Sequence, residues 1–150
     1  MFKLFLFLHL LAAIFAVGPL IGAATTASRA LRSPDADAAR SAARTIRIYS
    51  YASVVVVLFG FALMSTKAPW DSSQQVADIG DTWILVSIVL WGASVAVALG
   101  GLVPALQHAE KTIRDGGSVA TMTGRVAAFG GATGLLYAAI VLLMVYQPGG

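Results

Sequence analysis

Residues 84–106 read ILVSIVLWGASVAVALGGLVPAL, and this stretch contains no Asp, Glu, Lys or Arg. It is long enough to cross the hydrocarbon core of a bilayer, which takes about 20 residues in a helix. Three further uncharged apolar segments occupy residues 4–23, 48–65 and 126–146. The sequence therefore predicts an all-α protein, a bundle of four transmembrane helices in a single domain over residues 1–150. The predicted connections are residues 24–47, 66–83 and 107–125.

The composition agrees with a membrane protein and excludes several functional classes. Hydrophobic residues make up 58% of the chain and charged residues 11%, whereas a soluble domain has roughly 25% charged residues. There is no cysteine, which excludes disulfides, thiolate metal sites and cysteine nucleophiles. The formal charge is +3, but the basic residues flank the apolar segments, so no nucleic-acid partner is predicted. The first apolar segment exceeds the 7 to 15 residues of a signal-peptide core, which favours a span.

The distribution of positive charge predicts the orientation of the helices. Eight basic residues lie in two of the connections: Arg29, Arg32, Arg40, Arg44 and Arg47 in the first, and Lys111, Arg114 and Arg125 in the third. By the positive-inside rule, connections 24–47 and 107–125 are cytoplasmic, and both termini face outward. Trp70 and Trp83 bracket the outer connection, as expected for residues of an aromatic belt.

The two cytoplasmic connections contain recognisable helix signals. The triplet Ser33-Pro34-Asp35 predicts a helix start that leads into the second span. Along that helix Arg40, Arg44 and Arg47 recur at helical spacing. They are candidates to bind lipid headgroups, with ~1 kcal/mol per charge against anionic lipid, or they form a solvated face that only sets topology. Glu110 and Arg114 form an i,i+4 pair before the turn residues Asp115-Gly116-Gly117.

An internal repeat is suggested by small residues. Residues 16–23, AVGPLIGA, align with residues 98–105, ALGGLVPA, which predicts two hairpins related as a parallel 2+2 repeat; chance similarity between membrane helices is the alternative. Small residues also predict close helix packing. The positions expected at such contacts are Gly18, Gly22, Gly92, Ala96, Gly100, Gly130 and Gly134.

One ionisable residue, His9, lies inside a span, where such residues are costly and often functional. The helical rise places it about 8 Å from the outer end of its helix, and Trp91 and Tyr137 roughly 12 Å from theirs. These three residues are therefore predicted to form a cofactor-binding cluster, with His9 as haem ligand, quinone hydrogen-bonder or proton relay. The alternative is a neutral histidine that donates one hydrogen bond to a carbonyl or to Tyr137. His108 lies at the opposite end of the bundle and cannot join it.

The sequence contains no recognisable catalytic constellation. No two carboxylates face each other within the spans, and no Ser-His-Asp set shares a depth. A non-catalytic membrane protein is the leading hypothesis, either an accessory subunit of a larger assembly or a small binding module. Membrane lipids, other membrane subunits or further copies of the chain are its expected partners. The alternative is a haem- or quinone-binding redox protein, and the role of the connection from Lys67 to Asp81 stays open.

The stretch Leu8-His9-Leu10-Leu11-Ala12-Ala13, followed by Gly18, resembles the first helix of a group of small bacterial membrane proteins. This group includes the four-helix family called domain of unknown function 2269. It is similar more distantly to copper-resistance D domains and to HemJ-like protoporphyrinogen oxidases. The resemblance implies a multi-pass protein of the bacterial plasma membrane. Of the haem-binding features of those relatives, it carries over only His9, as a candidate ligand of haem b.

Overall fold

The computed structural model describes residues 1–69, 71 and 73–148, and its regular elements are helices. The first span contains α1 (Phe2–Ala12), η1 (Ala13–Val17) and α2 (Gly18–Thr26), followed by the short α3 (Arg29–Arg32). The second span is α4 (Ala36–Met64). The third contains α5 (Thr82–Val97), η2 (Ala98–Leu102) and α6 (Val103–Arg114), and the fourth is α7 (Ala120–Tyr146). The four continuous helical stretches are long and apolar enough to cross a membrane. The predicted all-α class with four transmembrane helices is confirmed.

The first and third spans each contain one wide, π-helical turn. These turns, η1 and η2, are each followed by a helix whose second residue is a proline, Pro19 in α2 and Pro104 in α6. Proline has no backbone N–H, and its ring crowds the carbonyl four residues earlier, so the regular hydrogen-bond pattern breaks there. The first and third spans are thus irregular near their middle, whereas the second and fourth spans, α4 and α7, are continuous helices.

The helix start at the first connection differs from the prediction. The N-cap of α4 is Asp35, whose carboxylate accepts hydrogen bonds from the backbone N–H groups of Asp37 and Ala38, both at 2.9 Å. Ser33 is instead the C-cap of α3, where its backbone N–H donates to the Arg29 carbonyl, and the N-cap of α4 lies two residues later, after Pro34.

At the other connection, α6 ends at Arg114, as the turn residues predict. The expected pair is confirmed, with Arg114 Nε 3.2 Å from Glu110 Oε1. A second contact was not predicted: Arg114 Nη2 lies 2.7 Å from Asp37 Oδ1 and links α6 to α4. The two charged connections are therefore joined by an ion pair.

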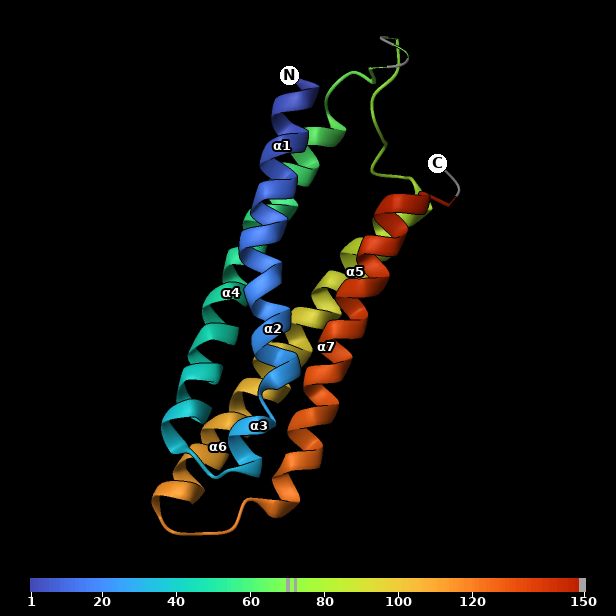
Figure 1. Ribbon diagram of the computed structural model, residues 1–150. Helices are drawn as coiled ribbons and strands as arrows, with labels where there is room; N and C mark the ends of the chain where they lie inside the picture. Colours follow the sequence, from blue (N-terminus) through green and yellow to red (C-terminus); the bar gives the residue numbers. More distant parts are fainter. Residues whose placement is uncertain (70, 72, 149–150) are drawn as a thin grey trace.

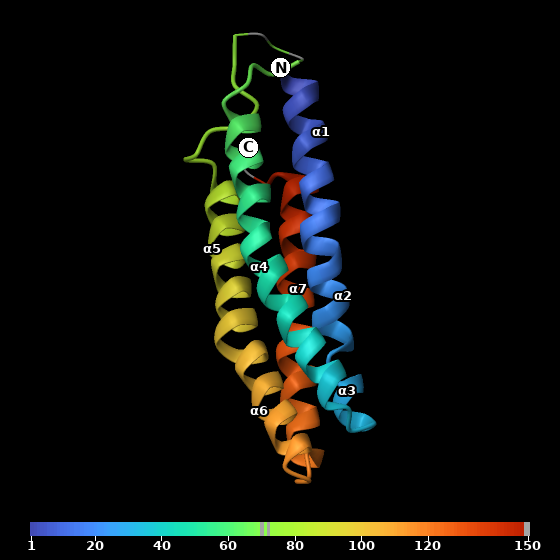
Figure 2. The ribbon, with the colours of Figure 1, turned by 90° about the vertical axis from the view of Figure 1, so that its left-hand side faces the viewer.

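The helices run side by side in an elongated bundle (Figures 1 and 2). One end, which we call the terminal end, carries the start of α1, the end of α7 and the described residues between α4 and α5. The opposite, hairpin end carries the other two connections. The main hydrophobic core lies mostly toward the hairpin end. Its largest fully buried side chains are Leu20, Ile46, Leu102, Leu106 and Val126.

Two helices approach each other closely at Gly130 on α7. A Cβ atom built there would overlap the carbonyl oxygen of Ala24 and lie 2.9 Å from its carbonyl carbon. One turn further along, a Cβ at Gly134 would lie 3.2 Å from the Thr25 side chain. These two predicted packing positions therefore lie where α7 meets α2.

The remaining predicted packing positions lie away from helix contacts within the described part of the chain. A Cβ at Gly18, Gly22, Gly92 or Gly100 would meet nothing within 4 Å, and Ala96 is exposed. Packing of another helix at these positions stays a prediction. Small residues four apart define a helix face, but they do not specify which neighbour, if any, packs on it.

Candidate functional site

A cavity opens between two pairs of helices toward the terminal end. The pair α1 and α4 diverges there from the pair α5 and α7 (Figure 1). The space between them is a partly open cavity of about 660 Å³, lined by residues of all four helices. This volume is in the range of small-molecule sites, roughly 300 to 1,000 Å³. The walls are almost wholly apolar, so the few polar groups on them stand out.

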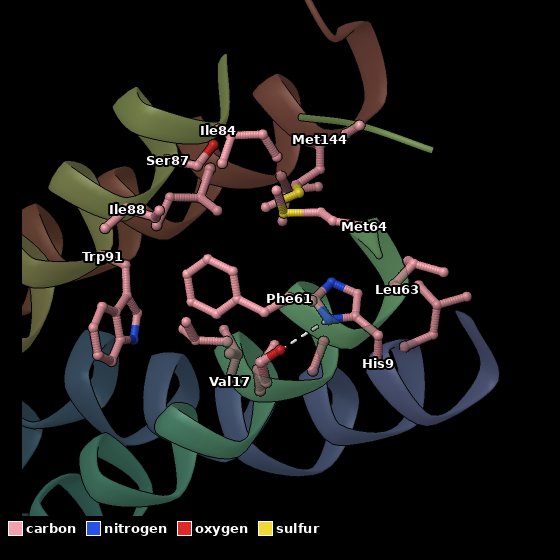
Figure 3. A pocket seen from close by; sticks show the side chains of 18 of the residues that line it. His9, Val17, Phe61, Leu63, Met64, Ile84, Ser87, Ile88, Trp91 and Met144 are labelled. Carbon is pink, nitrogen blue, oxygen red and sulfur yellow. Dashed lines mark hydrogen bonds between the residues drawn. The ribbon is translucent and has the colours of Figure 1, made fainter. Parts of the chain in front are cut away.

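His9 is held in this cavity by a contact with the backbone of α4. Its Nδ1 lies 2.9 Å from the carbonyl oxygen of Val56 (Figure 3). A Cβ built at Gly60, one turn along α4, would lie 3.2 Å from Cε1 and 3.4 Å from Nδ1 of His9. Because Gly60 has no side chain, the imidazole can rest directly against the α4 backbone.

A short chain of hydrogen bonds connects α5 to α4. The indole Nε1–H of Trp91 donates to Ser53 Oγ at 3.0 Å, and the Ser53 hydroxyl donates to the Ser50 carbonyl at 2.7 Å. Ser53 is fully buried. Both Trp91 and Ser53 line the cavity, so this chain fixes the indole ring in one wall.

Two further hydroxyl groups on the cavity wall have no hydrogen-bond partner among the described residues. They belong to Ser87 on α5 and Tyr137 on α7, each 3% exposed. The Tyr137 hydroxyl lies near the side chains of Ser53 and Ser94, but it makes no hydrogen bond of ordinary geometry with them. A buried hydroxyl without a partner costs roughly 1 to 3 kcal/mol, and the hydroxyls of Ser50 and Ser94, which do not line the cavity, also lack one within the described part of the chain.

The three residues of the predicted cluster line the same cavity. They do not bond to one another: His9 bonds to Val56 and Trp91 to Ser53. His108 is exposed on α6, toward the hairpin end, away from the cavity. Among the described residues, no group of three or more His, Cys, Asp or Glu could hold a metal ion.

The connection between α4 and α5 covers part of the cavity. Val76 and Ala77 line it, and Ala77 packs with Trp83 and Ile84. Trp83 is 5% exposed, so its assignment to an aromatic belt is wrong; the ring is drawn into the bundle because the connection folds back over it. Trp70, the other belt candidate, lies outside the described residues.

The exposed part of this connection is held by local hydrogen bonds. The hydroxyl and the backbone N–H of Ser73 donate to Asp71 Oδ1 at 2.6 and 2.9 Å, and these bonds lower the pKa of Asp71. At the hairpin end, Arg40, Arg44 and Arg47 are all exposed along α4. They are therefore free to reach either lipid headgroups or solvent.

Sequence reasoning missed Gly60, Ser53 and Ser87. The signal was present for the two serines, because hydroxyl groups in an otherwise apolar span tend to face the bundle interior. Gly60 gave a weaker signal, a single glycine between two phenylalanines. Its role depends on which helix crosses there, and that is a tertiary property.

A family model with the description "predicted integral membrane protein (DUF2269)" matches residues 3–148. The chain belongs to this family. No curated protein and no solved structure matches it. As a DUF2269 protein with four spanning helices, it is a multi-pass integral membrane protein surrounded by lipid. In this DUF2269 chain the match covers all four helices and hence every residue of the cavity.

Proposed function

We propose that the chain is a small, non-catalytic binding module that takes up a lipid-soluble ligand in the cavity beside His9. The observation that supports this is a cavity of about 660 Å³ whose mainly apolar wall carries the imidazole of His9. A packing defect between apolar helices would favour apolar walls, because unpaired polar groups are costly in hydrocarbon. Polar groups placed on a mainly apolar wall are typical of ligand sites.

The module acts as an accessory subunit of a larger membrane assembly or of a complex of its own copies. Support comes from exposed small residues. Gly92, Ala96 and Gly100 lie at spacing four on the third span, and Gly22 is exposed on the first. Such faces permit close approach of another membrane helix.

The ligand hypothesis is tested on protein purified in native nanodiscs without added compounds. Organic extraction followed by mass spectrometry is expected to recover one small molecule, or one narrow class, in near-equal amount to the protein and above its share in the surrounding membrane. An extract that only mirrors the bulk lipid composition would contradict the proposal.

Haem is a second candidate ligand, favoured by the orientation of His9. The Val56 carbonyl takes up Nδ1 and leaves Nε2 free, which is the usual arrangement of a metal-bound histidine. The protein would then be a redox protein with haem b bound at His9. An absorbance spectrum of the purified protein tests whether haem binds at His9. If it does, the spectrum should show a Soret band that disappears in His9→Ala and persists in His108→Ala. A spectrum without a Soret band would contradict haem binding.

We also propose that the hairpin end faces the cytoplasm of a bacterium and that the termini face outward. The chain has no cysteine, so single cysteines can be introduced and labelled. Cysteine in place of Gln75 is expected to react with an impermeant maleimide on intact cells, and cysteine in place of Arg40 or Lys111 only after the membrane is opened. Labelling of the Arg40 or Lys111 position on intact cells would reverse the orientation.

A further inference from the structure

The polar groups of the cavity define what the ligand must offer. Trp91 and Ser53 are occupied with each other, and the hydroxyl oxygens of Ser87 and Tyr137 are buried beneath neighbouring atoms, so they do not face the ligand space. The polar side-chain groups left for a ligand are therefore the second ring nitrogen of His9, Nε2, and the amide of Gln147, which also lines the cavity. In Figure 3 Nε2 points away from the Val56 carbonyl, toward the side of the cavity where Met64 lies.

The hydrogen bond to Val56 determines the tautomer of His9. A carbonyl oxygen can only accept, so Nδ1 must carry the hydrogen and donate it. In a neutral imidazole the other nitrogen is then an acceptor. Nε2 is therefore a hydrogen-bond acceptor that faces the ligand space.

The apolar part of the wall indicates the shape of the ligand. Four aromatic side chains line the cavity: Phe61, Trp83, Trp91 and Tyr137. Flat aromatic groups favour stacked or edge-to-face neighbours of the same kind. At the rim, lining residues such as Ile14 and Val145 are 66% and 72% exposed, so an apolar tail can leave the cavity into lipid.

We infer that the ligand is a phenolic lipid, such as a hydroquinone with an apolar tail, whose hydroxyl donates to Nε2 of His9. The corresponding quinone has only carbonyl acceptors and would leave Nε2 without a donor, so the cavity selects the reduced form. This inference rests on the proposed function, because it names the ligand class of the same cavity.

The test compares three probes of matched shape: decylhydroquinone, decylbenzoquinone and the dimethyl ether of decylhydroquinone. Binding to protein in nanodiscs is followed by quenching of tryptophan fluorescence, since Trp83 and Trp91 line the cavity, and protein-free nanodiscs correct for partition. Decylhydroquinone is expected to bind roughly three- to tenfold more tightly than either other probe, the value of one net hydrogen bond. In His9→Phe the three probes should bind alike, and His108→Phe should keep the preference.

Equal binding of the three probes to the wild type would overturn the inference and leave the proposed function intact. So would a failure of all three to bind while extraction recovers another ligand. If no probe binds and extraction recovers nothing, both proposals fall.

A second measurement does not depend on how well His9→Phe folds. The chain has only two histidines, so ¹⁵N-histidine labelling gives spectra that His108→Phe assigns directly. In the free protein, Nδ1 of His9 is expected to carry a proton and Nε2 to lack one. A protonated Nε2 would overturn the inference.

Discussion

Replacing Gly130 with alanine is expected to lower the free energy of unfolding by about 3 kcal/mol, the upper range for overpacking. The new methyl group would overlap the Ala24 carbonyl oxygen. That atom belongs to a helix backbone and cannot rotate aside, so α2 and α7 must separate. Unfolding can be measured by titration with sodium dodecyl sulfate in mixed micelles, with circular dichroism as the readout.

The matched controls lie on the same helix. A Cβ at Gly131 meets nothing within 4 Å, so Gly131→Ala should keep full stability or gain slightly. At Gly134 the Cβ would lie 3.2 Å from a Thr25 side-chain carbon, which can move, so Gly134→Ala should fall between the two. If Gly130→Ala unfolds like Gly131→Ala, the close contact between α2 and α7 is absent in the native protein.

Replacing Ser87 with phenylalanine is expected to reduce the amount of co-purified ligand at least tenfold. Ser87 is buried, lines the cavity and has a free hydroxyl. The aromatic ring is expected to reach the cavity and occupy part of the volume that the ligand needs. Because Ser87 is only 3% exposed, the ring must also displace neighbouring side chains, so a loss of stability of roughly 1 to 3 kcal/mol is expected with it. The measurement is the ligand-to-protein ratio after purification in nanodiscs, alongside the detergent titration.

Two variants on the same helix serve as controls. They distinguish filling of the cavity from the addition of a ring elsewhere and from the loss of the Ser87 hydroxyl. Val89 is 68% exposed to the lipid side, so Val89→Phe adds the same ring outside the cavity and should keep the ligand. Ser87→Ala removes only the hydroxyl and should weaken binding less than Ser87→Phe does. If Ser87→Phe folds and still retains the ligand, the cavity is not the binding site.

The sequence predicted the fold well because each span is encoded locally. An uncharged apolar run of sufficient length must become a helix in lipid, where every backbone polar group needs an internal partner. Helix ends followed local signals less exactly: Asp35 caps α4 where Ser33 was expected. The orientation of the bundle and the internal repeat stay predictions.

The site was predicted only in part. The helical rise predicted that His9, Trp91 and Tyr137 lie at similar distances from the outer ends of their helices. All three line the cavity. The partners of His9 could not be predicted, because the Val56 carbonyl and the space above Gly60 depend on how α1 crosses α4. For the same reason the inward position of Trp83 was missed, since it depends on how residues 65–81 fold back.

The wide turn η1 lies between His9 and the segment of the first span that packs in the main core. In a regular helix each residue adds about 100° of rotation. Deleting one residue from Ala13–Val17 would therefore turn the half of the span that carries His9 relative to the half that carries Leu20, and would move the imidazole away from Gly60 without disturbing the core. The number of residues in η1 thus determines whether His9 faces the cavity or the lipid. Loss or gain of one residue in this turn would therefore remove or create the site while the rest of the bundle stays the same.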